Sequence, residues 1–380
     1  MPHPLKSYLT TISGMARSNW PRAWTPPVPS TARWSAERAR QWYAESGWRM
    51  GCNYAPASAG NQLEMWQAET WDPARIDQEL GWAANLGMNS LRVFLHDLLF
   101  ERDQENFLAR VDEFLGIADS HGIATMLVLF DGVWHPEPRL GPQGEPRPKT
   151  HNSMWLQSPG AAILRDRSRW PALRPYVEGV MERFGSDARV CTWDLFNEPD
   201  QTNAISYPRK EVDDKSDLCD ELVSQVFDWS QAVDPDQPLT AGVYLGVDGA
   251  VERVNKLART MLSRSDVISF HSYSPGRKLR GTIQHLQRYE RPLLCTEWMA
   301  RTLGSPVELI DLLAEENVSA WCWGLVDGRS QTRYSWTSWL READENATWF
   351  HDLLHPDGSP YDEAEAERLR AAARRMTASR

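Results

Sequence analysis

Two glutamates directly follow short apolar segments of the chain. Glu198 ends the run that begins at residue 190, and Glu297 follows residues 293–296. Both segments are rich in strand-forming residues and have the pattern of strands buried on two faces. Pro199 ends the first one, because proline has no N–H to donate to a ladder. Cleavage of a glycosidic bond requires such a pair, with one carboxyl group giving a proton to the leaving oxygen and the other stabilising the reacting carbon.

The chain around these glutamates alternates between strand-like and helix-like segments. Apolar runs predict strands at 48–54, 91–95, 124–130, 190–197, 239–243, 267–271, 293–296 and 319–324. Amphipathic periodicity predicts helices at 73–86, 107–120, 176–184, 218–232, 251–262, 282–289, 308–316 and 362–376. Eight such units predict a single (β/α)₈ TIM barrel over residues 48–380. A doubly wound open sheet is the alternative, disfavoured because no glycine-rich phosphate turn follows the first strand.

Two segments depart from this alternation. Residues 1–47 begin with several prolines and no hydrophobic period, and we expect them to form an N-terminal arm packed on the barrel. Residues 131–160 after the third strand hold six prolines among glycines, which predicts a long loop. Loops of this length inside a compact domain usually serve a function.

Polar and aromatic residues recur where the predicted strands end. On a barrel these ends meet at one opening. The residues are Arg92, His96, Trp134, His135, Asn197, Glu198, His271, Tyr273, Glu297 and Trp323, and Trp336 follows in the loop after the last strand. Trp321 and Trp323 face the same side of their strand, so the earlier one is expected in the core and the later one nearer the opening.

The surroundings of the two glutamates predict different protonation. Glu198 ends a hydrophobic strand, and burial there would raise its pKa and keep it protonated as a general acid. Glu297 has Arg92 and the Tyr273 hydroxyl as candidate partners, which would hold it ionised as a nucleophile. Arg92 has a second candidate partner in Asp194. A carboxyl separation of roughly 5–5.5 Å would give retention of configuration.

Composition excludes several classes of function. The net charge of −11 disfavours nucleic acid and anionic membrane surfaces as partners. Nineteen tryptophans are unusually many, and their flat apolar faces suit sugar rings as well as core packing. The five cysteines are scattered and form no zinc or redox motif, and no cofactor or metal is expected. The sequence shows no stretch typical of a signal peptide or a membrane span. These features favour a cytoplasmic location, and they leave the oligomeric state open.

The run Trp193-Asp194-Leu195-Phe196-Asn197-Glu198-Pro199, paired with Thr296-Glu297-Trp298, resembles clan A glycoside hydrolases, most of all glycoside hydrolase family 5. The resemblance extends from about residue 48 to about residue 357. It implies Glu198 as acid/base, Glu297 as nucleophile and Asn197 as a partner of the sugar 2-hydroxyl. It also implies that Arg92 and Tyr273 support the nucleophile and that His271 contacts Glu198 or substrate. Trp323 would lie under the ring of the sugar that is cleaved off. His135 corresponds less closely to the family's third-strand histidine, and His96 competes for that role.

The leading interpretation is a retaining β-glycosidase that acts on β-linked oligosaccharides. The loops 131–160 and 325–345 are expected to close one end of the cleft, which favours removal of a terminal sugar. An endo-β-1,4-glycanase and a non-catalytic carbohydrate-binding barrel are the alternatives. A metal-dependent hydrolase would require a His-x-His motif or a His/Asp cluster at the strand ends, and the sequence has no evident one. The sugar could be mannose, galactose, glucose or xylose.

Overall fold

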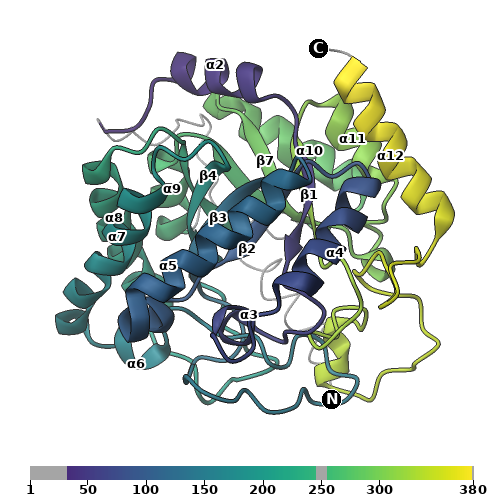
Figure 1. The fold of residues 1–380 in the computed structure, drawn as a ribbon. Helices are drawn as coiled ribbons and strands as arrows, with labels where there is room; N and C mark the ends of the chain where they lie inside the picture. Colours follow the sequence, from purple (N-terminus) through teal and green to yellow (C-terminus); the bar gives the residue numbers. More distant parts are fainter. Residues whose placement is uncertain (1–31, 245–254, 379–380) are drawn as a thin grey trace, which may run out of the picture.

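The computed structural model describes residues 32–244 and 255–378, and its strands close into a parallel barrel (Figure 1). The strands are β1 (Met50–Tyr54), β2 (Ser90–Phe94), β3 (Ala124–Asp131), β4 (Val190–Asn197), β5 (Leu239–Tyr244), β6 (Ile268–His271), β7 (Leu293–Trp298) and β8 (Ser319–Trp323). Each strand pairs with the next, and β8 pairs with β1, so the sheet has no free edge. The predicted (β/α)₈ barrel is therefore confirmed, and an open sheet is excluded.

Helices follow the strands and surround the barrel. They are α2 (Ala36–Ser46), α3 (Gln62–Trp66), α4 (Pro73–Asn85), α5 (Asp97–Ser120), α6 (Ala161–Leu164), α7 (Arg174–Phe184), α8 (Lys215–Val233), α9 (Lys256–Arg264), α10 (Gly276–Leu286), α11 (Leu309–Glu315) and α12 (Glu363–Ala378). None of the helices in the described ranges has the length and hydropathy needed to cross a membrane. The start of the predicted helix 251–262 lies outside the described residues.

The prediction of a helix over 107–120 was wrong at its start. Helix α5 begins at Asp97, where the His96 ring accepts a hydrogen bond from the Leu98 backbone N–H. The backbone leaves helical geometry at Asp103, so two helical segments join there at a kink. The polar stretch around this kink has no apolar period, which is why the sequence pattern missed the first segment.

Helix α2 covers the end of the barrel opposite the long loops (Figure 1). The Ser35 hydroxyl begins the helix by accepting a hydrogen bond from the Arg38 N–H. Ala39 and Tyr43 then pack with the buried Trp321 in one apolar cluster. This helix falls within the predicted N-terminal arm, whose residues 1–31 lie outside the described ranges. The amino-terminal end of the barrel is therefore filled by side chains, which leaves chemistry to the other end.

The C-terminal helix α12 completes the outer ring between α11 and the end of α4 (Figure 1). Arg368 forms an ion pair with Asp311 on α11, and Arg370 donates to the Asn85 backbone oxygen at the end of α4. A Cβ atom on Gly87 would lie 2.7 Å from the Ala373 side chain, so a glycine is needed where α12 meets this turn. The amphipathic pattern that predicted a helix closing the ring is confirmed.

Candidate active site

Arg92 lies inside the barrel on β2 and connects the polar residues around it. The buried guanidinium donates to Asp194 Oδ2 from Nε (3.0 Å) and Nη2 (2.8 Å), to Asn197 Oδ1 (2.6 Å), to Asn53 Oδ1 (2.7 Å) and to Glu297 Oε1 (3.0 Å). A charge at this depth is stable only when it is paired and hydrogen-bonded. The two partners foreseen for Arg92, Asp194 and Glu297, both bind it. One arginine therefore fixes the relative positions of β1, β2, β4 and β7 at the opening.

The end of β4 turns Glu198 toward the centre of the barrel. The pairing of β4 with β5 is irregular between Asp194 and Asn197, and Glu198 itself has φ 37°, in the left-handed region that non-glycine residues rarely adopt. Gly132 lies against this turn, where a Cβ atom would be 2.3 Å from the Glu198 backbone oxygen. Its N–H donates to the Asn197 backbone oxygen over 2.8 Å. Such local strain is typical of functional sites, where the surrounding structure holds it in place.

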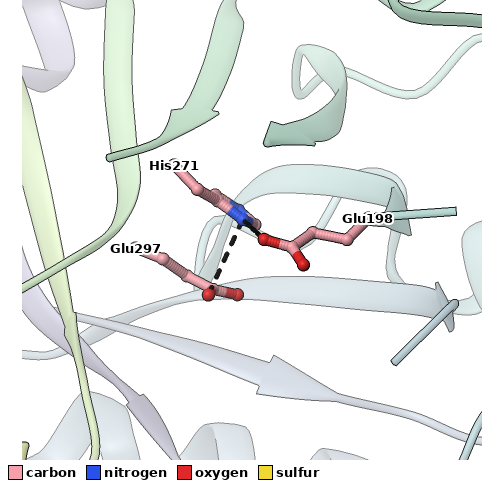
Figure 2. A group of neighbouring side chains, drawn as sticks. All are labelled: Glu198, His271 and Glu297. Carbon is pink, nitrogen blue, oxygen red and sulfur yellow. Dashed lines mark hydrogen bonds and ion pairs between the residues drawn. The ribbon is translucent and has the colours of Figure 1, made fainter. Parts of the chain in front are cut away.

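Glu198 and Glu297 converge on His271, which comes from the end of β6 (Figure 2). His271 Nδ1 lies 2.6 Å from Glu198 Oε1 and 3.6 Å from Glu297 Oε2. One oxygen of each carboxylate and one ring nitrogen all lie within 4.8 Å of one another. The Tyr273 hydroxyl donates to Glu297 Oε2 over 2.8 Å. The expected contacts of His271 with Glu198, and of Arg92 and Tyr273 with Glu297, are present.

Burial dominates the protonation of this group. It raises the pKa of Glu198 to about 7, and it also raises the pKa of Glu297 to about 7 although His271, Arg92 and Tyr273 oppose the rise. Burial lowers the pKa of the His271 ring to about 4, so this ring is neutral at pH 7. The Arg92 and Tyr273 contacts that were expected to hold Glu297 ionised are present, and they favour its charged form against the effect of burial.

The Asn197 amide is held in one orientation by two charged neighbours. Its oxygen accepts from Arg92, and its Nδ2 donates to Asp131 Oδ1 over 3.0 Å. Asp131 ends β3 and also accepts from the Trp155 indole N–H (2.7 Å) and the Val133 backbone N–H (2.9 Å). Burial raises the pKa of Asp131 to about 6. Because an arginine can only donate, the assignment of the amide oxygen to the Arg92 side follows from chemistry.

A narrow cavity of about 130 Å³ opens above the two glutamates. Its lining includes seven of the residues predicted from the sequence, which are Trp134, Asn197, Glu198, Tyr273, Glu297, Trp323 and Trp336. Arg92 and His271 lie fully buried behind this lining and bind the glutamates. Trp321 is fully buried near α2, whereas Trp323 borders the cavity, as the alternation along β8 predicted.

Two further predicted residues, His96 and His135, do not line the cavity either. His96 is buried at the start of α5, where Nδ1 lies 3.0 Å from Asp97 Oδ1. His135 packs edge-on against Tyr207 and lies 3.4 Å from the Lys210 ammonium. Both come directly after a strand or in its loop, but their contacts lie outside the cavity lining.

Several cavity residues were not identified from the sequence. They include His151, Gln201, Tyr244, Trp339 and His351. His351 follows β8 by almost thirty positions, and His151 lies within the long proline-rich loop, so neither is next to a strand end. The density of tryptophans in the region 321–349 was the one signal that this part of the chain contributes to the site.

The loops after β3 and β8 are joined along one side of the cavity. The Asn152 N–H donates to the Ser330 backbone oxygen (2.8 Å), and the His151 N–H donates to Ser338 Oγ (2.9 Å). The Trp134 and Trp339 rings are stacked, with centroids 5.7 Å apart. The cavity continues into a wider hollow of about 850 Å³ that shares Ile205, Tyr244, Tyr273 and Trp336 with it and is also lined by the loop after β8.

Within the described residues, Glu198, His271 and Glu297 are also the group with suitable atoms for holding a metal ion. Two carboxylates and an imidazole are acceptable ligands for zinc. However, the Arg92 guanidinium is already 3.0 Å from Glu297 Oε1, and a metal ion there would face this like charge. The arginine already supplies positive charge to Glu297 and Asp194. That the site works without a metal ion is a prediction.

Comparison with known proteins finds the same fold in glycoside hydrolases. No family model matches the chain, and no curated protein matches it. Among solved structures, the GH5_18 enzyme from Streptomyces cattleya in complex with GlcNAc is 15% identical, with a TM-score of 0.55 over 87% of this chain and 80% of that one. A second structure of that enzyme contains Manβ1-4GlcNAc.

Two further structures extend this similarity. The exo-β-1,4-mannosidase from Opitutaceae bacterium strain TAV5 is 17% identical, with a TM-score of 0.56 over 87% of this chain and 60% of that one. The endo-1,4-β-D-mannanase from Thermotoga petrophila RKU-1 is 15% identical, with a TM-score of 0.52 over 86% and 100%. The predicted resemblance to family 5 glycoside hydrolases is thus confirmed for the fold. Identities this low do not decide the substrate or the choice between exo and endo action.

Proposed function

We propose that the protein is a retaining β-glycosidase that removes a terminal sugar from β-linked oligosaccharides. The observation that carries this proposal is the approach of Glu198 and Glu297, with one oxygen of each within 4.8 Å. Retaining enzymes place their carboxyl groups roughly 5–5.5 Å apart, whereas inverting enzymes leave roughly 6.5–9.5 Å for a water molecule. The short gap therefore supports direct attack by a carboxylate on the sugar.

In the first step, ionised Glu297 attacks the anomeric carbon and Glu198 donates its proton to the departing oxygen. The contacts support these roles, because Arg92 and Tyr273 donate to Glu297 and favour its charged form, while burial raises the pKa of Glu198 and favours its protonated form. In the second step, Glu198 takes a proton from water while the water oxygen attacks the anomeric carbon, which breaks the bond to Glu297 and releases the sugar. The fixed Asn197 amide is the proposed partner of the sugar 2-hydroxyl, and Trp323 the floor under the ring.

The shape of the cavity supports exo action. The joined loops after β3 and β8 border its narrow part, which suits a single sugar, and the wider hollow beside it has room for a leaving group. The structural similarity to endo-mannanases supports endo action as the second candidate. Defined β-linked oligosaccharides distinguish the two, because exo action releases monosaccharide from the outset and endo action releases products of mixed size.

The test is a panel of aryl β-glycosides of mannose, galactose, glucose and xylose. We expect hydrolysis of at least one by the wild-type protein, no hydrolysis by Glu297→Ala, and ligand binding by both in calorimetry. The exposed Glu137→Ala, which pairs with Lys210 outside the cavity, is the matched control and is expected to retain activity. A wild-type protein that binds oligosaccharides and cleaves none would be a binding barrel, and release of the inverted anomer would refute the covalent mechanism.

A 2-deoxy-2-fluoro aryl glycoside gives an independent readout. The fluorine slows the second step more than the loss of a good leaving group, so the glycosyl ester accumulates. Mass spectrometry is then expected to find the added sugar on the peptide that contains Glu297 and on no other. Labelling of a different carboxylate would reassign the nucleophile.

A further inference from the structure

Two buried histidines outside the proposed acid/base group line the same cavity. His151 comes from the long loop after β3, and His351 comes from the segment after β8. Their ring centroids lie 5.4 Å apart. The mechanism proposed above uses neither of them, and a buried imidazole is costly unless its polar atoms are paired.

Backbone carbonyls decide which nitrogen of each ring carries the proton. His151 Nδ1 lies 2.7 Å from the Tyr334 backbone oxygen, and His351 Nδ1 lies 2.6 Å from the Met299 backbone oxygen. A carbonyl oxygen only accepts, so each Nδ1 is a donor and each neutral ring has an acceptor at Nε2. Burial keeps both rings neutral by lowering the pKa of His151 to about 4 and that of His351 well below its ordinary value.

The acceptor on His351 has no partner of its own. Its Nε2 is buried and receives no hydrogen bond from the part of the chain that the structure describes. The neighbouring rings are those of His151, Phe350, Tyr273 and Trp336, and none of them donates a hydrogen bond to it. A ligand with a hydrogen-bond donor would satisfy it.

The histidine pair lies one side chain away from the proposed nucleophile. The Tyr273 ring centroid is 5.5 Å from that of His351, and the Tyr273 hydroxyl donates to Glu297. Because His351, the His151 ring beside it and Glu297 line one cavity, a sugar whose anomeric carbon meets Glu297 shares that cavity with both histidines. The only atoms of such a sugar that can donate are its hydroxyl groups.

We propose that His151 and His351 select the sugar by accepting hydrogen bonds from its free hydroxyls remote from the anomeric carbon. The inference rests on the proposed function and names its substrate class, which is a neutral terminal sugar with unsubstituted hydroxyls at that edge. A glycosidic or ether oxygen has no proton to donate, so a chain that continued beyond this sugar would leave a buried acceptor unpaired. A uronic acid carboxylate is rejected for the same reason.

The experiment combines two variants with deoxy substrates. In His151→Asn and His351→Asn the amide N–H can still donate to the Tyr334 or Met299 carbonyl, while the acceptor at Nε2 is lost. Each variant is assayed on the best aryl β-glycoside and on its 3-, 4- and 6-deoxy analogues. His121→Asn, at the far end of α5 and paired with Asp77, is the matched control.

We expect removal of at least one hydroxyl to lower the wild-type kcat/KM by roughly 100-fold. In one of the two variants, removal of the same hydroxyl should lower kcat/KM by less than about 3-fold, because the histidine that accepts from that hydroxyl is already gone. Equal deoxy penalties in the wild type and in both folded variants would overturn the inference. If a variant does not fold, wild-type penalties below about 3-fold for all three analogues would overturn it.

Failure of the proposed function is distinguishable from failure of the inference. A wild-type protein that hydrolyses no glycoside is tested by calorimetry with methyl β-glycosides and their deoxy analogues. If the wild type binds a deoxy analogue more weakly than the parent glycoside, and a histidine variant binds the two equally, the histidines select hydroxyls even without catalysis. Absence of glycoside binding refutes both.

Discussion

Replacing Tyr273 by phenylalanine removes one donor from the proposed nucleophile and little else. The hydroxyl donates to Glu297 Oε2 over 2.8 Å, and both side chains are buried. A hydrogen bond to a charged group contributes about 1.5–3 kcal/mol, and about 1.4 kcal/mol corresponds to one pKa unit. Because the donor stabilises the carboxylate, its loss should raise the pKa of Glu297, which burial already places at about 7, by a further ~1–2 pH units.

The assay is the pH profile of kcat/KM on an aryl β-glycoside, measured from pH 4 to pH 10. The acid limb reports ionisation of the nucleophile in the free enzyme, so it should move to higher pH in Tyr273→Phe, and activity at pH 6 should fall by about 10–100-fold. Tyr207→Phe is the matched control, since the Tyr207 hydroxyl donates to the Ser153 backbone oxygen (3.2 Å) outside the cavity lining. An acid limb that coincides with that of the wild type would refute the assignment of Glu297.

Three further predictions concern the proposed acid Glu198, the buried Arg92 and the joined loops after β3 and β8. Glu198→Gln should lower kcat/KM by at least about 100-fold on a substrate with a poor leaving group and much less on dinitrophenyl glycosides, which need no acid. Arg92→Met should lower the free energy of unfolding by about 3–5 kcal/mol at pH 7, measured by urea unfolding, because the buried Asp194 loses its counter-charge. A decrease of less than about 1 kcal/mol would contradict this. Trp339→Ala should remove the stack on Trp134, where the loops after β3 and β8 meet, and raise activity on trisaccharides relative to disaccharides. Product analysis would detect this change, and an unchanged ratio of the two activities would contradict the role of the joined loops in closing the cavity.

The strand ends were predictable because a parallel barrel imposes strong local rules. Its strands are buried on both faces, so each one appears in the sequence as a short apolar run, and a polar residue at its end is conspicuous. Arg92, Glu198, His271 and Glu297 were found in this way. The prediction for α5 shows the limit of the method, because a cap and a kink within a polar stretch produce no periodic signal.

The side chains contributed by loops were not predictable from the same rules. His96 and His135 follow strands as the predicted site residues do, yet they contact Asp97 and Tyr207 and do not line the cavity. His151 and His351 have no strand beside them and still line the cavity, because side-chain and backbone hydrogen bonds join two loops almost 200 positions apart. Such contacts depend on how loops pack against each other, which no period of a single segment encodes.

By itself, the sequence determined that two carboxylates end two buried strands of one barrel, because burial and strand propensity act locally and leave a readable pattern. Tertiary structure alone decided how deeply those carboxylates are buried and which donors reach them. Burial raises the pKa of both groups, and the Arg92 and Tyr273 donors that favour the charged form of Glu297 come from β2 and from the segment after β6. The distance between the two groups was likewise decided only when β4 and β7 closed into the same ring.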